Sequence, residues 1–230
     1  GYKSDNLLLN LVKDSFTFPS LKEIGFQKSN IVVPSFTFQN LEKYEDVRNI
    51  PSLAQTSHLS THLRFGSISV RQTVSKAREI NDTFLSELIW REFFMQTLFQ
   101  TPRVISTCYK SKYEAMKWRN NEVEFEKWCN GETGYPMVDA GMRQLNETGL
   151  MHNRVRMVTA SFLVKHLLID WRWGEAYFAK KLLDYDLSAN NGNWQWAAGT
   201  GCDAAPYFRI FNPTEQLKKF DPKLIYVRRW

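Results

Sequence analysis

The pattern of apolar and polar positions changes near residue 41 of this 230-residue chain. Before that point phenylalanines alternate with small polar residues and proline, as in Phe16-Thr17-Phe18-Pro19 and Pro34-Ser35-Phe36-Thr37-Phe38. Such alternation is compatible with two short strands, but an extended linker lying on a surface is the better interpretation. Residues 1–40 are therefore expected to be a linker left from an interdomain connection, in the back part of a longer protein.

From about residue 41 the apolar positions recur at the spacing of amphipathic helices. No convincing strand pattern, internal repeat or low-complexity tract follows, so residues 41–230 are expected to form a mainly α-helical domain. One segment is apolar almost all round beyond Val155, which predicts a buried central helix. The predicted helices cover residues 67–80, 83–100 (capped by Asp82 or Thr83), 122–129, 137–147, 153–169 and 175–183.

Composition and charge narrow the function classes. Hydrophobic residues make up 43% of the chain and charged residues 23%, as is ordinary for a soluble globular protein. A net charge of +6 and a pI near 9.2 make a polyanion or an acidic surface a plausible partner. Cys108, Cys129 and Cys202 lack metal-type spacing, which favours a reducing compartment and the cytoplasm. No apolar stretch is long enough to cross a bilayer, so no membrane partner is expected.

The run from Asp184 to Trp196, DYDLSANNGNWQW, gathers carboxylates, amides and indoles around one glycine. These residues are poorly suited to a plain hydrophobic core, because burying an unpaired polar group costs roughly 2–7 kcal/mol. They suit a pocket that hydrogen-bonds a large polar aromatic ligand and keeps tryptophan close to it. The run therefore predicts a cofactor site.

A cluster of hydroxyls in Thr56-Ser57-His58-Leu59-Ser60 precedes another helical region. Hydroxyls and backbone amides near a helix start can hold phosphate oxygens, although simple helix capping is the alternative. His58 and His62 have the four-residue spacing of metal ligands, but no third ligand accompanies them, so no metal site is expected.

Glu87, Trp90, Arg91 and Phe94 fall on one side of the predicted helix that contains them. A carboxylate, an indole and a guanidinium placed together can read a base edge and stack on it. The alternative is an Arg–Glu surface pair beside a core tryptophan, and the pattern alone leaves both open.

Two arginines and three tryptophans also stand out. Arg154 and Arg156 lie at the N-terminal end of the predicted buried helix, where the helix dipole prefers anions. Cations placed there make sense if phosphate binds nearby, so they indicate an anionic ligand. Trp118, Trp171 and Trp194 lie in different segments, and all three are compatible with plain core positions.

From about Tyr44 to Trp230 the chain resembles the DNA photolyase/cryptochrome family. Its motifs are closest to those of class I photolyases, which repair cyclobutane pyrimidine dimers. The Met-His-Asn-Arg start of the buried helix matches that group, where (6-4) photolyases and animal cryptochromes usually carry His-His. The motifs that carry the resemblance, in chain order, are Leu88-Ile89-Trp90-Arg91-Glu92-Phe93, Thr133-Gly134-Tyr135-Pro136, Val138-Asp139-Ala140-Gly141-Met142-Arg143-Gln144-Leu145, Met151 to Met157, Asn190 to Trp196 and Asp203-Ala204-Ala205-Pro206-Tyr207-Phe208-Arg209.

The resemblance implies an all-helical domain that holds FAD in a U shape. Asn190 matches the residue that faces the flavin ring edge, where a hydrogen bond can stabilise the reduced ring. The other positions that match FAD contacts are Tyr44, Thr56, Ser57, His58, Leu59, Ser60, Phe84, Arg156, Asp184, Tyr185 and Asp186.

The resemblance also implies a pocket for a dimer flipped out of the DNA, since photolyases are among the enzymes that flip bases. Trp90 and Trp196 would supply its apolar walls, and Glu87 would hydrogen-bond the damaged base. Trp194, Trp171 and Trp118 match a chain of indoles that carries electrons to the flavin. The remaining positions expected to bind the lesion or the DNA are Arg48, Arg91, Phe94, Asn153, Arg154, Met157 and Gln216.

Two features depart from the family pattern. Leu150 stands where many relatives carry Trp, so one pocket wall or packing contact is expected to differ. Family members normally begin with an α/β antenna domain, which would hold an antenna chromophore such as folate or deazaflavin. That domain is missing here and the sequence stops before the usual end, so a fragment or a trimmed protein is expected.

The resemblance implies a monomeric, DNA-binding lyase that uses light to repair pyrimidine dimers, with electrons supplied by photoexcited reduced FAD. The first alternative is a cryptochrome-type blue-light photoreceptor that uses the same flavin without repair. A second alternative is a helical module that binds flavin or nucleic acid without light-dependent chemistry. Light-driven loss of dimers distinguishes the repair lyase from both alternatives.

Overall fold

The computed structural model describes residues 19–39, 41–53, 55–203 and 210–230. Its internal contacts divide the chain into residues 1–32 and residues 33–230. Of the first unit, the described part contains a turn in which the backbone N–H and hydroxyl of Ser20 donate to Glu23, at 2.6 and 2.7 Å. Residues 1–18 and 40 of the expected linker, and residues 204–209 of the last family motif, lie outside the described residues.

The second unit is helical, as the sequence predicts, and its described residues contain no strand. In the labels below, α marks an α-helix and η a short 3-10 helix. Its elements are η2 (Leu41–Lys43), α1 (Tyr44–Val47), η3 (Pro51–Leu53), α2 (Leu59–Phe65), α3 (Val70–Ile80), α4 (Asp82–Gln100), η4 (Pro102–Ile105), η5 (Ser111–Tyr113), α5 (Glu122–Asn130), α6 (Pro136–Thr148), α7 (Asn153–Lys165), α8 (Trp171–Lys181), α9 (Leu187–Ala198), α10 (Pro213–Phe220) and α11 (Ile225–Arg229).

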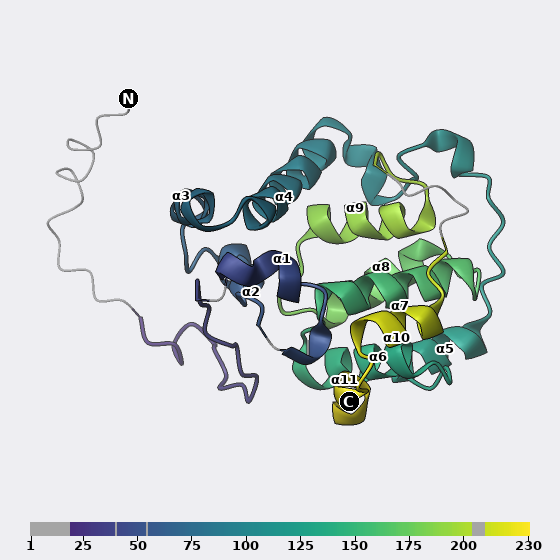
Figure 1. Ribbon diagram of the computed structural model, residues 1–230. Helices are drawn as coiled ribbons and strands as arrows, with labels where there is room; N and C mark the ends of the chain where they lie inside the picture. Colours follow the sequence, from purple (N-terminus) through teal and green to yellow (C-terminus); the bar gives the residue numbers. More distant parts are fainter. Residues whose placement is uncertain (1–18, 40, 54, 204–209) are drawn as a thin grey trace, which may run out of the picture. The chain divides into compact units, whose positions relative to one another are not determined.

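The arrangement builds outward from α7 and α9. Helix α7 packs against α6, α8 and α9, while α9 also contacts α8 and α4 (Figure 1). On one side α3 packs along α4, and on the other α5, α10 and α11 pack on α6. The chain thereby forms a large core around α5–α9 and a smaller one around α2–α4.

The expected linker includes residues 33–39, which belong to the second unit. They form neither helix nor strand and lie on α2 and α3. The Pro34 carbonyl lies 3.0 Å from Nε2 of His62, and the Phe36 ring packs edge-on against the same imidazole. The Lys76 ammonium lies 4.5 Å from the centre of the Phe38 ring. These residues are therefore an extended segment held against helices.

Most predicted helices are present, with shifted ends. Helix α4 is capped by Asn81, whose side chain accepts from the Phe84 N–H at 2.9 Å, so the predicted caps Asp82 and Thr83 are wrong. Thr83 instead donates its hydroxyl to Glu45, at 2.6 Å. Helix α8 begins four residues earlier than predicted because Asp170 caps it by accepting from the Arg172 N–H.

The central helix α7 is buried over most of its length, as predicted, but ends at Lys165 instead of residue 169. Leu168 adopts a left-handed backbone with φ of 53°, and the N–H groups of Leu167 and Ile169 turn back to carbonyls of the last helical turn. Ile169 is fully buried in this returning loop. The apolar pattern therefore continues past the end of the helix.

Helix α9 (Leu187–Ala198), which the periodicity did not predict, contains most of the polar run of residues 184–196. Asp186 caps it by accepting from the Ala189 N–H at 3.1 Å and from the Ser188 hydroxyl. Gln195 and Asn191 are buried and donate their side-chain amides to the Val104 carbonyl, both at 3.0 Å. Polar side chains thus connect α9 to η4, which explains why the helix lacks an apolar period.

Close packing of α8 on α9 leads to a stability prediction. A Cβ on Gly174 would lie 2.2 Å from Trp194 and 2.6 Å from Leu163. Gly174→Ala should therefore lower the free energy of unfolding by about 1–3 kcal/mol through overpacking, although alanine favours helices. Urea unfolding measures this, with the exposed Ala176→Ser on the same helix as control, expected to change stability by less than about 0.5 kcal/mol. Equal stability of the two variants would contradict the packing.

Candidate functional site

A large cavity lies between the smaller core and the larger one. It has a volume of about 500 Å³, within the range of small-molecule sites, and adjoins a second cavity of about 110 Å³. Helices α2 and α4 form one side of the large cavity, and the start of α7 with one face of α9 forms the other. Residues expected as site residues that line one or both cavities are Arg48, Ser57, Leu59, Ser60, Phe84, Glu87, Trp90, Arg91, Phe94, Asn153, Arg156, Met157, Asp184, Tyr185, Asp186, Asn190, Trp194 and Trp196.

The hydroxyl cluster reaches this cavity in part. Ser57 and Ser60 line it, whereas Thr56 and His58 do not. His58 occupies the N-cap position of α2 without a side-chain capping bond, and burial lowers the pKa of its imidazole. Ser57 contributes only a long bond from the Leu59 N–H, at 3.4 Å. Capping therefore accounts for little of the cluster, and the Ser57 hydroxyl is available to an anion in the cavity.

Arg156 and Asp184 form an ion pair in the wall of both cavities. One guanidinium nitrogen lies 2.9 and 3.1 Å from the two carboxylate oxygens, and the Asp184 side chain is only 5% exposed. Burial alone would raise the pKa of Asp184, but Arg156 and the Ser60 hydroxyl hold it below its ordinary value. The pair ties α7 and α2 to the segment before α9 and keeps a carboxylate ionised at the cavity wall.

The arginines at the start of α7 therefore have partners inside the protein. Arg156 pairs with Asp184, and Arg154 donates to the Asn49 side chain at 2.6 and 3.2 Å while lying over the Phe220 ring. The prediction that these cations indicate an external anion is thus weakened, because Asp184 supplies the negative charge near this helix end. Arg64, which the sequence analysis missed, also lines the cavity and donates to the Tyr185 carbonyl at 2.6 Å.

The small cavity is bordered by amides and an indole. Asn190 donates its NH₂ to the Glu175 carbonyl and carboxylate, at 3.1 and 2.9 Å. This use of its donors leaves the Asn190 amide oxygen as the acceptor for a ligand. Trp194, 2% exposed, lines the same cavity, and Asn193 lines both cavities.

Asn193 was missed although it lies in the run that predicted the cofactor site. Recognition of α9 as a helix would have found it. Ala189, Asn193 and Trp196 stand four and three residues apart, so they share one helical face. All three line the large cavity.

The opposite wall of the large cavity is aromatic. The helix face of Glu87, Trp90, Arg91 and Phe94 lies together on the cavity, as predicted. Trp90 is 42% exposed, which excludes the alternative of a core tryptophan. The ion pair of Glu87 is with Arg48, at 2.6 Å, instead of with Arg91. Trp196 and Met157 face this wall from α9 and α7, so two indoles and a carboxylate border one opening.

Seven expected site residues do not line either cavity: Thr56, His58, Tyr44, Arg154, Gln216, Trp118 and Trp171. Tyr44 packs edge-on against Phe84, and burial raises the pKa of its phenol to about 12. Gln216 lies on α10 with a buried amide oxygen that has no hydrogen-bond partner among the described residues.

The three tryptophans of the expected electron chain all belong to the larger core. Trp194 and Trp171 are buried, and Trp118 is a partly buried residue that packs against the same core. Gly174 contacts Trp194, and Trp171 stands three residues earlier on the same face of α8. The loop after Trp118 runs beside the start of α8, where the Arg119 N–H donates to the Leu168 carbonyl and Asn120 accepts from the Asp170 N–H. Contacts therefore lead from the small cavity toward the surface through these segments.

His152 gives the site a pH-dependent element. Its Nδ1 accepts from the Arg154 N–H as the cap of α7, which requires an unprotonated ring. Burial, with the charges of Arg156 and Arg154, lowers the pKa of His152 from 6.5 to about 4. Because the unfolded chain binds this proton first, stability should be full above about pH 6.5 and should fall as the pH approaches 4.

Between pH 7.5 and pH 5 the expected loss from His152 is about 2 kcal/mol, since each pKa unit corresponds to about 1.4 kcal/mol. Urea unfolding of the wild type and His152→Asn at both pH values measures this. Asparagine caps helices without titrating, so its profile should be flatter. Parallel profiles would contradict the assignment.

Among the described residues, no group of three His, Cys, Asp or Glu side chains lies close enough to hold a metal ion. Within the same residues, no helix has the length and apolar character needed to span a bilayer.

A family model described as the FAD binding domain of DNA photolyase matches residues 84–230. A deoxyribodipyrimidine photo-lyase from Vibrio cholerae is 46% identical over 95% of this chain and 50% of its own length. Among solved structures, a class III photolyase from Agrobacterium tumefaciens is 48% identical with a TM-score of 0.78, covering 82% of this chain and 41% of that one. A Synechocystis cryptochrome is 35% identical with a TM-score of 0.78, covering 95% and 50%.

The chain spans about half the length of the curated relatives it matches. The expected class I type stays a prediction. The matched residues make up more than half of the sequence, and they carry the cavity walls contributed by α4, α7 and α9. The chain therefore belongs to the family of the FAD binding domain of DNA photolyase.

Proposed function

We propose that this chain is the catalytic part of a light-dependent DNA lyase, which uses FAD to split cyclobutane pyrimidine dimers. The observation that carries the proposal is the pair of adjoining cavities, with a polar end suited to a dinucleotide and an aromatic opening suited to unstacked bases. Asn153, Met157 and Trp196 line both cavities, so a ligand in one would contact a ligand in the other. Residues 41–230 form the proposed catalytic domain, with residues 1–40 as its linker.

The donors and acceptors of the cavity fit FAD. Ser57, Ser60 and Arg64 present hydroxyls and a positive charge of the kind that binds a diphosphate. The ionised carboxylates near α9 can accept from ribose or ribityl hydroxyls. The Asn190 oxygen, held outward by Glu175, can accept from a ring N–H. Trp194 and Phe178 provide apolar surface in the small cavity for an aromatic ring.

When bound in its reduced form, FAD supplies on absorbing light the electron that splits the cyclobutane ring and takes the electron back afterwards. The protein positions the two reactants and excludes water between them. Trp90 and Trp196 stack on the flipped dimer from opposite helices, and Met157 closes the space between them. Glu87, held by Arg48, accepts a hydrogen bond from a base edge. No net redox change occurs, so the reaction is a lyase reaction.

Oxidised flavin has to be reduced before repair. We propose that, with FAD bound, Trp194 at the small cavity would supply an electron to photoexcited oxidised flavin. Trp171 and then Trp118 would replace the electron that Trp194 has lost. Their common core and the contact of Trp194 with α8 support this order. The net charge of +6 supports a DNA partner whose binding weakens with added salt. We further propose that the protein is a monomer and that it acts in the cytoplasm. The free thiols of Cys108, Cys129 and Cys202 support the second of these.

Binding in darkness tests the substrate. The purified chain, loaded with FAD, is titrated with a duplex that contains one thymine dimer and with the undamaged duplex at the same salt concentration. A lesion enzyme should bind the damaged duplex at least about tenfold more tightly, as expected for a flipped and stacked dimer. Equal affinity for both duplexes would contradict the proposal and would favour a photoreceptor of the cryptochrome type.

A further inference from the structure

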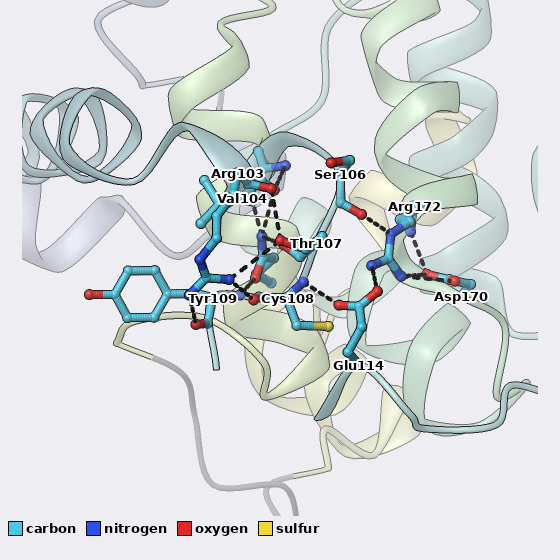
Figure 2. A network of polar contacts seen from close by, with 11 residues as sticks. Arg103, Val104, Ser106, Thr107, Cys108, Tyr109, Glu114, Asp170 and Arg172 are labelled. Carbon is cyan, nitrogen blue, oxygen red and sulfur yellow. Dashed lines mark hydrogen bonds and ion pairs between the residues drawn. The ribbon is translucent and has the colours of Figure 1, made fainter. Parts of the chain in front are cut away.

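Arg172 connects three segments beside the middle tryptophan of the proposed electron chain. Its Nε donates to the Ser106 carbonyl at 2.9 Å, and its two terminal nitrogens reach Glu114 at 2.7 Å and Asp170 at 3.2 Å. Figure 2 shows the guanidinium between these two carboxylates, with Glu114 also facing the backbone of Cys108. One positive charge is therefore balanced by two negative charges on different segments.

The same guanidinium lies against Trp171, with its central carbon 4.8 Å from the ring centre. A cation at this distance stabilises the neutral indole and disfavours loss of an electron, because the oxidised ring is itself positive. The carboxylates of Asp170 and Glu114 act in the opposite sense. How easily Trp171 is oxidised therefore depends on the balance of these three charges.

Two neighbours favour the negative charge of Glu114, whose side chain is 44% exposed. The Cys108 N–H donates to its carboxylate at 2.7 Å and lowers its pKa, and Arg172 lowers it further. This carboxylate is held by a loop, whereas Asp170 is the cap of α8 and has a structural role. Glu114 is thus the member of the cluster whose charge can be removed with the least structural disturbance.

Trp171 is placed so that an electron can leave without a proton. The ring is 1% exposed, and its N–H has no hydrogen-bond partner among the described residues. Its neighbour is the buried thiol of Cys108, whose pKa is raised by burial and by Glu114 despite the contact with the indole. A neutral thiol is a very weak base, so the oxidised indole would retain its proton.

We propose that the charge cluster of Arg172, Asp170 and Glu114 sets how readily Trp171 passes an electron along the tryptophan chain. The proposal rests on the proposed function. Photoexcited oxidised flavin is the oxidant at the start. Trp171 first gives one electron to oxidised Trp194 and then regains one electron from Trp118. No bond forms or breaks and no proton leaves Trp171. Arg172 and Glu114 are positioning residues that act through the indole.

The test uses the FAD-loaded chain with Trp118→Phe, so that the positive charge left by electron transfer is shared between Trp194 and Trp171. Transient absorption then measures the lifetime of the oxidised indole. The signal decays when the flavin returns its extra electron to oxidised Trp194. Glu114→Gln should disfavour charge on Trp171 and shorten the lifetime roughly threefold or more, whereas Arg172→Gln should lengthen it by a similar factor. Glu114→Asp and Arg172→Lys keep the charges and should restore the original lifetime.

Glu215→Gln, in an exposed ion pair with Lys218, is the control and should leave the lifetime unchanged. Thermal unfolding of each variant shows whether it is folded. If Glu114→Gln and Arg172→Gln change the lifetime in the same direction, or if neither changes it, the proposed role of the charge cluster is wrong. The proposed function would not be affected by that result. A lifetime unchanged by Trp171→Phe would instead overturn the route through Trp171, and with it this part of the proposed function.

Discussion

Asp184→Asn should abolish the retention of FAD during purification and lower the free energy of unfolding by about 3 kcal/mol. The substitution leaves Arg156 without its partner at a largely buried site, and breaking a buried pair by removing one charge typically costs 3–5 kcal/mol. The Arg156 side chain is 27% exposed, which places the expected cost at the lower end. The cavity would also lose a carboxylate that two helices hold in place.

Urea unfolding of the flavin-free chain and the flavin absorbance of the purified protein measure the two effects. Glu215→Gln is the matched control, because its exposed pair with Lys218 should contribute less than about 1 kcal/mol. The Asp184 pKa is lowered, so the stabilisation is present above the ordinary aspartate pKa and is lost as the pH falls through the lowered value. Normal flavin retention by a stable Asp184→Asn variant would exclude Asp184 from the cofactor site.

Trp90→Ala should weaken binding of a dimer-containing duplex by roughly 10- to 100-fold, because stacking on an aromatic ring contributes about 1–3 kcal/mol per base. Glu87→Gln should weaken it as well, since the base edge would lose an ionised acceptor. Neither change should reduce FAD retention, because both residues lie on the aromatic wall. Binding measured in darkness separates recognition from repair.

Ile89→Ala is the control for the tryptophan, since Ile89 is an exposed neighbour on α4 that does not line the cavity. Glu79→Gln, on an exposed position of α3, is the control for the loss of a carboxylate. If Trp90→Ala and Ile89→Ala bind the damaged duplex equally well, the aromatic opening is not the lesion site. Such a result would favour a receptor that uses the same flavin without repair.

Helix class and the buried position of α7 were predictable because they depend on apolar periodicity. Helix α9 was not predictable in this way, since Asn191 and Gln195 face inward and are satisfied by the Val104 carbonyl. A polar residue that finds a partner far along the chain breaks the apolar period without breaking the helix. Its cap, Asp186, is the local signal that was available.

The site was predictable in composition but not in assembly. The run of residues 184–196 and the face of Glu87 and Trp90 were identified from residue types, yet only the fold shows that both border one cavity. The Arg156–Asp184 and Arg48–Glu87 pairs join residues far apart in sequence. Arg64 was missed because a single arginine on a short helix has no pattern that separates it from a surface charge.

The most direct test of the proposed function is repair of a thymine-dimer oligonucleotide by the purified chain, supplied with FAD and a reductant, in blue light and in darkness. Restored thymine is measured by chromatography, with Trp90→Ala as the variant deficient in substrate binding. The account predicts repair in light alone, strongly reduced in Trp90→Ala at limiting DNA. Equal amounts of intact dimer in light and darkness, from protein with a bound-flavin spectrum and normal binding of the damaged duplex, would contradict it.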